Sequence, residues 1–280
     1  MEKIFVLGVG CQKGGTTWLY KQLIKSEAVN FGYTKEYHVL DTIYTPYLFN
    51  NKPTLLEILR HHLNKNKRAP ANLLRQLLFL EDESTYYHYF NELWAKNKNT
   101  KIVGDITPSY CGLKKVHLST AKRRLEHLGF IVKIIFIMRD PVQRTWSACR
   151  HEKRFNPAMT HYSENDLVLH LYKSPGFEAR SRYDSTIKNI ESIFDQENIF
   201  YCLYENLFNK RSIDKLSNFL GVNADIFDAK DHVNTSFTHE ELSEATVREV
   251  AMHYSSVYEL VGSRFPIKNF WDSSLKIIDQ

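Results

Sequence analysis

The stretch that decides the fold is IFVLGVGCQKGGTTWLY, residues 4–20. It opens with a continuous apolar run, Ile4–Leu7, which is typical of a strand buried on both faces of a parallel sheet. Glycines interrupt this run, and Thr16–Tyr20 then starts a pattern that is typical of a helix. The sequence therefore predicts a strand, a glycine-rich loop and a helix at the start of the chain.

The same alternation continues along the chain. Ile131–Met138 is almost entirely apolar and predicts a central strand, and shorter strands are expected at 101–104 and 199–204. Helical patterns cover residues 51–99, 113–128, 181–194, 213–220 and 239–261. Because strands alternate with helices, we predict an α/β fold with a central parallel sheet and helices on both faces. Ligands of such sheets bind beyond the carboxyl ends of the strands.

Composition narrows the function only slightly. The formal net charge is +5, which suits an anionic ligand, a nucleic acid or a membrane surface without choosing among them. The four cysteines form no C-x-x-C pair, so we expect neither a metal site nor a disulfide framework. No signal peptide and no apolar run of the roughly 20 residues of a membrane helix are recognisable. We therefore expect no transmembrane segment and a cytoplasmic location.

The loop after the first strand has the features of an anion-binding site. Backbone N–H groups at the start of a helix favour anions, and Gly14 and Gly15 permit close approach of a ligand to the backbone. Lys13 adds a positive charge, and hydroxyl donors follow at Thr16 and Thr17. A phosphate loop of the G-x-x-x-x-G-K-[ST] type would have lysine where Thr16 stands, which argues against a Mg²⁺-dependent nucleotide kinase.

A second candidate phosphate site follows the predicted central strand. Arg139 stands directly after this strand, where its guanidinium is able to bind a phosphate through two hydrogen bonds. Ser147 lies eight positions further on, about two helical turns, so its hydroxyl falls on the same side of the following helix. We expect Arg139 and Ser147 to contact one phosphate.

Both segments resemble those of one enzyme family. QKGGTTWL (residues 12–19) resembles the 5′-phosphosulfate loop of sulfotransferases that use 3′-phosphoadenosine 5′-phosphosulfate (PAPS), and RDPVQRTWS (residues 139–147) resembles their RxPxxRxxS motif for the 3′-phosphate. The pattern is most similar to glycan enzymes of the heparan sulfate type and to bacterial sulfotransferases. The resemblance implies a P-loop-like sulfotransferase fold with helical insertions, PAPS as co-substrate, 3′-phosphoadenosine 5′-phosphate (PAP) as product, and no metal.

The resemblance also implies roles for individual residues. In that family the loop lysine, here Lys13, interacts with the bridging oxygen that leaves with the nucleotide. Trp18 either stacks on adenine or packs between helix and sheet, and both readings stay open. The residues expected to bind the donor are Lys13, Gly14, Gly15, Thr16, Thr17, Trp18, Arg139 and Ser147. A Lys-Gly-Arg loop that many members close over the 3′-phosphate has no clear counterpart, although Val233-Asn234 near Phe237 falls in that region.

Two residues are candidates for the base that takes the acceptor proton. Asp105 lies in GDITPSY (residues 104–110), which resembles the E-K-T-P-x-Y segment of glycan sulfotransferases, with Asp in place of the catalytic Glu and Ile106 in place of Lys. His117 lies in KVHL (residues 115–118), which resembles the K-T-H-L of cytosolic small-molecule sulfotransferases. An imidazole suits a base near neutral pH. We prefer Asp105 and keep His117 as the alternative.

The predicted function is transfer of a sulfuryl group from PAPS to an acceptor hydroxyl or amine. The expected acceptor is a saccharide or glycolipid in a bacterial cytoplasm, and a small lipid, polyketide or phenolic alcohol stays open; no nucleic-acid partner is expected. We treat residues 1–280 as one sulfotransferase domain, with 51–99 as a helical insertion near the acceptor cleft. A nucleotide kinase or a non-catalytic nucleotide-binding module would be the alternative of a different class.

Overall fold

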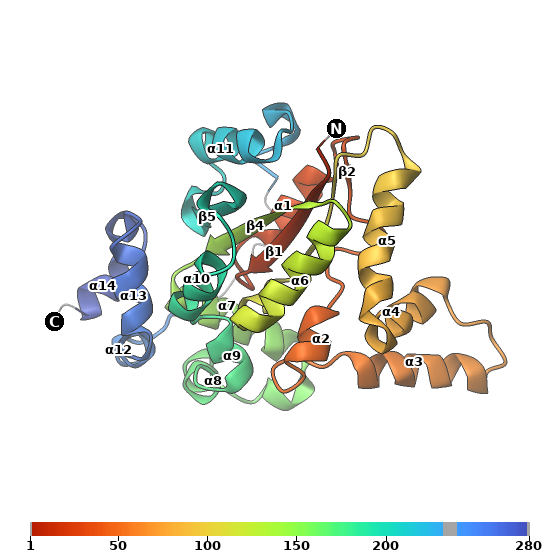
Figure 1. Cartoon of the computed structure of the whole chain (residues 1–280). Coiled ribbons are helices and arrows are strands. Elements are labelled where there is room, and N and C mark those ends of the chain that lie inside the picture. The colour runs from red at the N-terminus through yellow and green to blue at the C-terminus, as the bar shows by residue number, and fades with distance from the viewer. Residues whose placement is uncertain (1, 232–239, 279–280) are drawn as a thin grey trace.

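The chain is built around a single parallel sheet. The computed structural model describes residues 2–231 and 240–278, and within them five parallel strands are ordered β2-β3-β1-β4-β5 (Figure 1). The strands are β1 Ile4–Gly10, β2 Val29–Asn30, β3 Ile102–Ile106, β4 Ile131–Met138 and β5 Ile199–Leu203. The predicted parallel α/β sheet is confirmed.

Strand β1 occupies the centre of the sheet. It pairs with β3 on one side and with β4 on the other, so that Ile4 lies opposite both Ile102 and Ile131. Every residue of β1 is buried, which explains why its sequence is apolar without alternation. The loop that follows β1 therefore emerges from the middle of the sheet edge, between the loops that follow β3 and β4.

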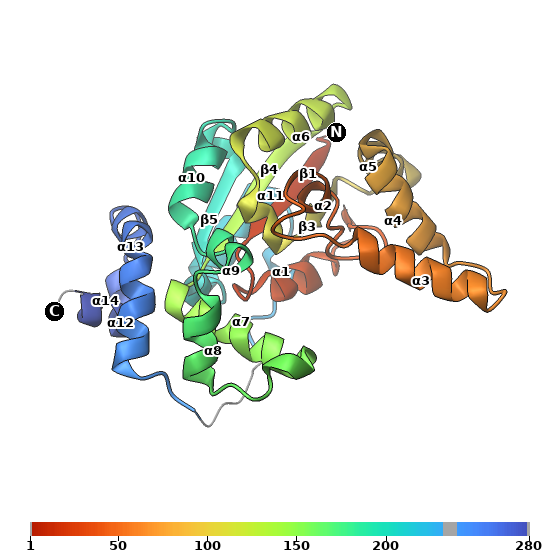
Figure 2. The ribbon, with the colours of Figure 1, turned by 90° about the horizontal axis from the view of Figure 1, so that it is seen from below.

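Helices connect the strands and cover both faces of the sheet (Figures 1 and 2). Alternate residues of β1 enter two separate cores: Phe5 and Leu7 pack with α5, α6 and α10, whereas Ile4 and Val6 pack with α1 and α11. The helices are α1 Thr16–Leu23, α2 Leu40–Tyr44, α3 Lys52–Asn64, α4 Ala71–Glu81, α5 Glu83–Lys96, α6 Lys115–His127, α7 Pro141–Phe155, α8 Glu164–Leu171, α9 Pro175–Ala179, α10 Tyr183–Glu191, α11 Lys210–Leu220, α12 Glu244–His253, α13 Ser255–Gly262 and α14 Asp272–Ile278.

Strand β2 and the segment 51–99 compare differently with what the sequence predicts. Strand β2 has only two residues, too few to give a periodic pattern, and the sequence did not predict it. In the segment 51–99, helices α3, α4 and α5 are present, and α3 and α4 project away from the sheet in both views (Figures 1 and 2). That this segment is an insertion near an acceptor cleft stays a prediction.

A buried carboxylate at the end of β3 connects the sheet to its surroundings. Asp105 is 0% exposed and accepts hydrogen bonds from Tyr86 Oη (2.9 Å), Tyr110 Oη (2.7 Å) and Thr107 Oγ1 (2.6 Å). These donors belong to α5 and to the chain that follows β3. Burial raises the pKa of Asp105 to about 6, although the hydrogen bonds favour its charged form. The network fixes the course of the chain from β3 into the next turn.

Replacing Asp105 is expected to reduce stability. Asp105→Ala would leave three hydroxyl groups in the protein interior without their acceptor, and each such group costs about 1–3 kcal/mol. The free energy of unfolding should fall by at least about 2 kcal/mol, measured by urea denaturation. Asp105→Asn, which keeps an acceptor oxygen, should lose less, and Asp225→Ala at an exposed position should change little. A similar small loss for Asp105→Ala and Asp225→Ala would contradict this role.

Candidate active site

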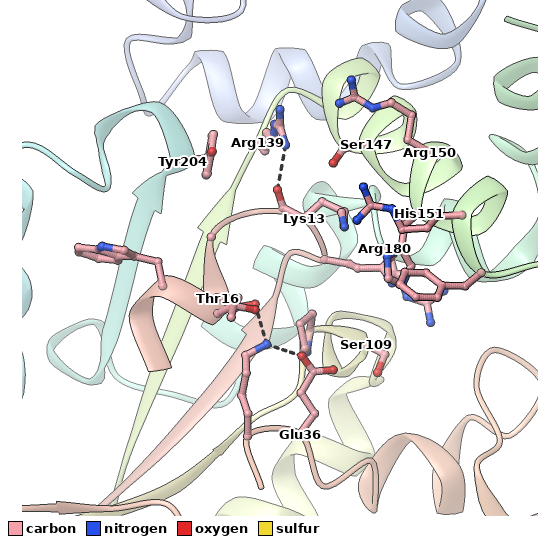
Figure 3. A pocket seen from close by; sticks show the side chains of 18 of the residues that line it. Lys13, Thr16, Glu36, Ser109, Arg139, Ser147, Arg150, His151, Arg180 and Tyr204 are labelled. Carbon is pink, nitrogen blue, oxygen red and sulfur yellow. Dashed lines mark hydrogen bonds and ion pairs between the residues drawn. The ribbon is translucent and has the colours of Figure 1, made fainter. Parts of the chain in front are cut away.

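A large cavity opens at the carboxyl edge of the sheet, where the loops after β1, β3 and β4 meet. Its volume is about 860 Å³, within the range of sites that hold small molecules or cofactors. Figure 3 shows the cavity with side chains from the β1–α1 loop, from helix α7, and from the chain after β2 and β3 pointing into it. The position agrees with the general rule for parallel sheets.

The glycine-rich loop presents its polar groups to this cavity. Lys13, Gly15, Thr16 and Thr17 line it, and Gly15 caps α1 in a left-handed conformation (φ 88°) without any side-chain hydrogen bond. The N–H groups of the first helical turn have no intrahelical partner, which makes this helix end suitable for an anion. Gly14 belongs to this loop but does not line the cavity. A Cβ at this position would lie only 2.7 Å from Cys11 Sγ, so a larger residue would not fit without a shift. The loop thus forms a cradle for an anion.

Arg139 lies beside this loop. Its Nη1 donates to the carbonyl of Lys13 at 3.0 Å, and its guanidinium lies 4.7 Å from the centre of the Tyr204 ring (Figure 3). Ser147 on α7 is 5% exposed and also lines the cavity. Apart from Gly14, the predicted donor-binding residues of both motifs therefore line one cavity.

Trp18 is mainly a core residue. It is 2% exposed, its indole N–H donates to the carbonyl of Asp228 at 2.9 Å, and its ring packs edge-on against Phe208. Trp18 still belongs to the cavity lining, so stacking on adenine stays a prediction. Val233, Asn234 and Phe237 lie outside the described residues.

The two predicted bases do not reach the cavity. Asp105 is fully buried, its carboxylate is bound by the tyrosine and threonine hydroxyls described above, and it is not among the lining residues. His117 lies on α6, stacks on Tyr44 with ring centres 4.6 Å apart, and accepts a hydrogen bond from the backbone N–H of Lys114. Neither side chain is placed to receive a proton from a ligand in the cavity. Because Asp105 points into the core and His117 lies on α6, the role of either residue as the base stays a prediction without support from the lining of the cavity.

The acidic side chain that does face the loop is Glu36, which follows β2. Lys35 Nζ donates to Thr16 Oγ1 at 3.2 Å and also forms an ion pair with Glu36 (Figure 3). One lysine therefore joins the phosphate loop to this carboxylate. The sequence analysis missed Glu36 because β2 was not recognised, so the charged segment Lys35–His38 could not be assigned to a strand end. A charged cluster between two apolar runs was the available signal.

His38 holds Glu36 in a half-buried array. Its Nε2 lies 3.2 Å from Glu36 Oε2, its Nδ1 lies 2.8 Å from Asp41 Oδ2, and Ser109 Oγ donates to the same Asp41 oxygen. Burial opposes a charge on His38, but the hydrogen bonds to Asp41 and Glu36 raise its pKa to about 9. Burial likewise opposes ionisation of Glu36, but His38 and Lys35 hold the pKa of that carboxyl below its usual value. At neutral pH the pair is an imidazolium and a carboxylate.

The cavity concentrates positive charge. Seven Lys and Arg side chains line it against two Glu, and this excess of five equals the net charge of the whole chain, so the remaining charges balance. The basic residues are Lys13, Lys35, Arg139, Arg150, Lys153, Arg154 and Arg180, and the acidic ones are Glu36 and Glu164. Burial lowers the pKa of Lys13, and the charges of Arg139 and Arg150 lower it further. An anionic ligand would relieve this repulsion, so the residues present fit a donor with two phosphate-type groups.

The described residues contain neither a cluster of metal ligands nor a helix suited to cross a membrane. In residues 2–231 and 240–278, no three His, Cys, Asp or Glu side chains cluster as metal ligands. None of the helices in these segments combines the length and apolar composition that a membrane crossing requires.

Comparisons with known proteins identify the family. The family model named sulfotransferase domain matches residues 2–256. The sulfotransferase from Alicyclobacillus acidocaldarius is similar with a TM-score of 0.59 and 18% identity over 94% of this chain and 97% of that one. The sulfotransferase STF9 from Mycobacterium avium is similar with a TM-score of 0.50 and 14% identity over 92% and 76%. Identities this low show a shared fold alone, and a search of curated proteins found no match. Since the family model covers most of its length, the chain belongs to the sulfotransferase domain family.

Proposed function

We propose that this protein transfers a sulfuryl group from PAPS to a hydroxyl group of a saccharide or a similar polar acceptor, releasing PAP. The observation that carries the proposal is the bridge of Lys35 between Thr16 of the phosphate loop and Glu36. This bridge holds a carboxylate next to an anion site, which is the combination that transfer from an anionic donor to an alcohol requires.

The donor-binding roles follow from position. The N–H groups of the first turn of α1, with the hydroxyls of Thr16 and Thr17, would hold the 5′-phosphosulfate. Arg139 and Ser147 would hold the 3′-phosphate. The donor supplies an activated sulfuryl group whose leaving oxygen gains negative charge. Lys13 places a cation at that end of the cavity, where it stabilises the transition state more than the ground state.

Glu36 is the base in this proposal, in place of Asp105 and His117. It is ionised at neutral pH and is therefore able to accept the acceptor proton, whereas His38, with its raised pKa, already carries a proton on each nitrogen. His38 orients Glu36, and Asp41 in turn orients His38. The polar lining on this side, which includes Ser109 and His151, supports an acceptor that carries several hydroxyl groups. The expected cytoplasmic location stays a prediction.

The protein should bind PAP in the presence of EDTA. Arg139→Ala should weaken PAP binding by roughly 10- to 150-fold, because a charge-assisted hydrogen bond contributes about 1.5–3 kcal/mol. Calorimetric titration with PAP and with adenosine 5′-phosphate provides the measurement, and Arg211→Ala on α11 is the control. If Arg139→Ala weakens the binding of PAP and of adenosine 5′-phosphate by the same factor, Arg139 does not contact the 3′-phosphate. Binding that requires Mg²⁺ would favour a kinase.

Glu36→Gln should lower kcat by roughly 10²–10⁴, because the amide cannot accept a proton. Its affinity for PAP should change little, since Glu36 lies on the acceptor side. Turnover is followed with labelled PAPS and a panel of saccharide acceptors, with Asp105→Asn as the matched control. Per folded molecule, Asp105→Asn should stay within a few-fold of the unsubstituted protein. The reverse ranking of the two variants would make Asp105 the base.

The His38 array should make stability depend on pH. A histidine whose pKa rises from an ordinary 6.5 to about 9 on folding contributes stability that is complete below pH 6.5 and is lost as pH rises through 9. The contribution is at most about 3 kcal/mol. Urea denaturation from pH 6 to 9.5 should show a steeper fall for the unsubstituted protein than for His38→Asn, in which asparagine tolerates the left-handed φ of 52°. Parallel curves would show that His38 is not ion-paired in solution.

A further inference from the structure

Arg180 is a cation of the cavity that the donor-binding residues do not explain. It follows α9, on a different part of the chain from both phosphate motifs, and it lines the cavity. The preceding residue, Ala179, contacts Cys111 in the turn that follows β3. The distance between Cys111 Sγ and the carbonyl oxygen of Ala179 is 3.5 Å. In Figure 3 Arg180 lies toward Ser109 and away from Tyr204. Arg180 is therefore on the side of the proposed base.

Not all N–H donors of the Arg180 guanidinium have a hydrogen-bond partner among the described residues. Nη1 donates to the carbonyl of Gly176 at 2.7 Å, and Nε is buried with no hydrogen-bond partner. Within the described part of the chain, no carboxylate forms an ion pair with Arg180, and no group accepts a hydrogen bond from Nη2. A partly buried guanidinium with an unsatisfied Nε and no ion pair is costly, and a ligand oxyanion would reduce this cost.

Three of the acids in or near the cavity already have other partners. Glu36 is bound to Lys35 and His38, and Asp41 is bound to His38 and Ser109. The other acidic lining residue, Glu164, accepts from Trp146 Nε1. Burial lowers the pKa of Arg180 and the positive charge of Arg144 acts in the same direction, whereas Cys111, Asp41 and Glu152 raise it. A ligand oxyanion in the cavity would add the direct ion pair that the described residues do not provide.

We propose that the acceptor is an anionic saccharide, and that Arg180 binds its carboxylate or sulfate ester while Glu36 receives the proton of the hydroxyl to be sulfated. This proposal rests on the proposed function, because it assumes that the other end of the cavity holds the nucleotide. Arg180 would be a specificity-determining residue that distinguishes charged from neutral acceptors. Its guanidinium suits both oxyanions, since each offers two oxygens to a planar pair of donors.

The test uses the protein saturated with PAP, so that the phosphate loop is filled. Three sugars are titrated in turn by calorimetry: D-glucuronate, D-glucose 6-sulfate and D-glucose. The affinity for PAP is measured separately on the same preparation. At least one of the two anionic sugars should bind tenfold or more tightly than glucose. The sugar that gains more identifies the carboxylate or the sulfate ester as the preferred group. Arg180→Gln should abolish the preference and change PAP affinity less than twofold.

Two further variants keep the result interpretable. Arg180→Lys retains the charge and should retain part of the preference even if Arg180→Gln is poorly folded, and Arg211→Gln on the exposed surface of α11 should behave like the unsubstituted protein. Equal or absent binding of all three sugars, or a preference that survives Arg180→Gln, would overturn the inference. PAP binding that remains intact in that case would leave the proposed function standing. Failure of the unsubstituted protein to bind PAP would sink both.

Discussion

The parallel pairing of β1 with β3 and β4 is the constraint on which the rest of the site depends. Parallel strands end at the same edge, so the loop after β1 and Arg139 after β4 have to meet there. The central place of β1 requires residues that are apolar on both faces, and these residues divide between two cores, one on each side of the sheet. Rigid packing beneath the loops allows the polar groups above them to be held in place without a ligand.

The cavity at the carboxyl edge of the sheet has an excess of positive charge that its own acidic residues do not neutralise. The lining carries an excess of five basic side chains, while the rest of the chain is balanced. Such an arrangement costs free energy in the protein without a ligand: burial lowers the pKa of Lys13, and the charges of Arg139 and Arg150 lower it further. The same repulsion favours binding of an anionic ligand, and it draws such a ligand toward the cavity from solution. Affinity for anions is therefore built into the charge distribution before any particular contact is considered.

The cavity separates into two chemically distinct ends. At one end, Lys13 and Arg139 are joined through the backbone of the phosphate loop. At the other end, Glu36 is held by His38 and Asp41, and Lys35 connects this array to the loop through Thr16. Arg180 also lines the cavity and adds to its positive charge.

The sequence by itself determined the parallel sheet, the anion-binding loop and the family, because these depend on local features: continuous apolar runs, glycines and short motifs with fixed spacing. It placed Lys13, Thr16, Thr17, Arg139 and Ser147 at strand ends, and the structure brings them to one cavity. Only the tertiary structure decided which acidic side chain lies beside this loop. Asp105 looks like a strand-end residue in the sequence, but its side chain points into the core and binds Tyr86 and Tyr110. Glu36 follows a strand of two residues, and Arg180 follows a short helix far along the chain. No local pattern reports such placements, because which face of a strand is buried and which loops meet depend on packing across the whole sheet.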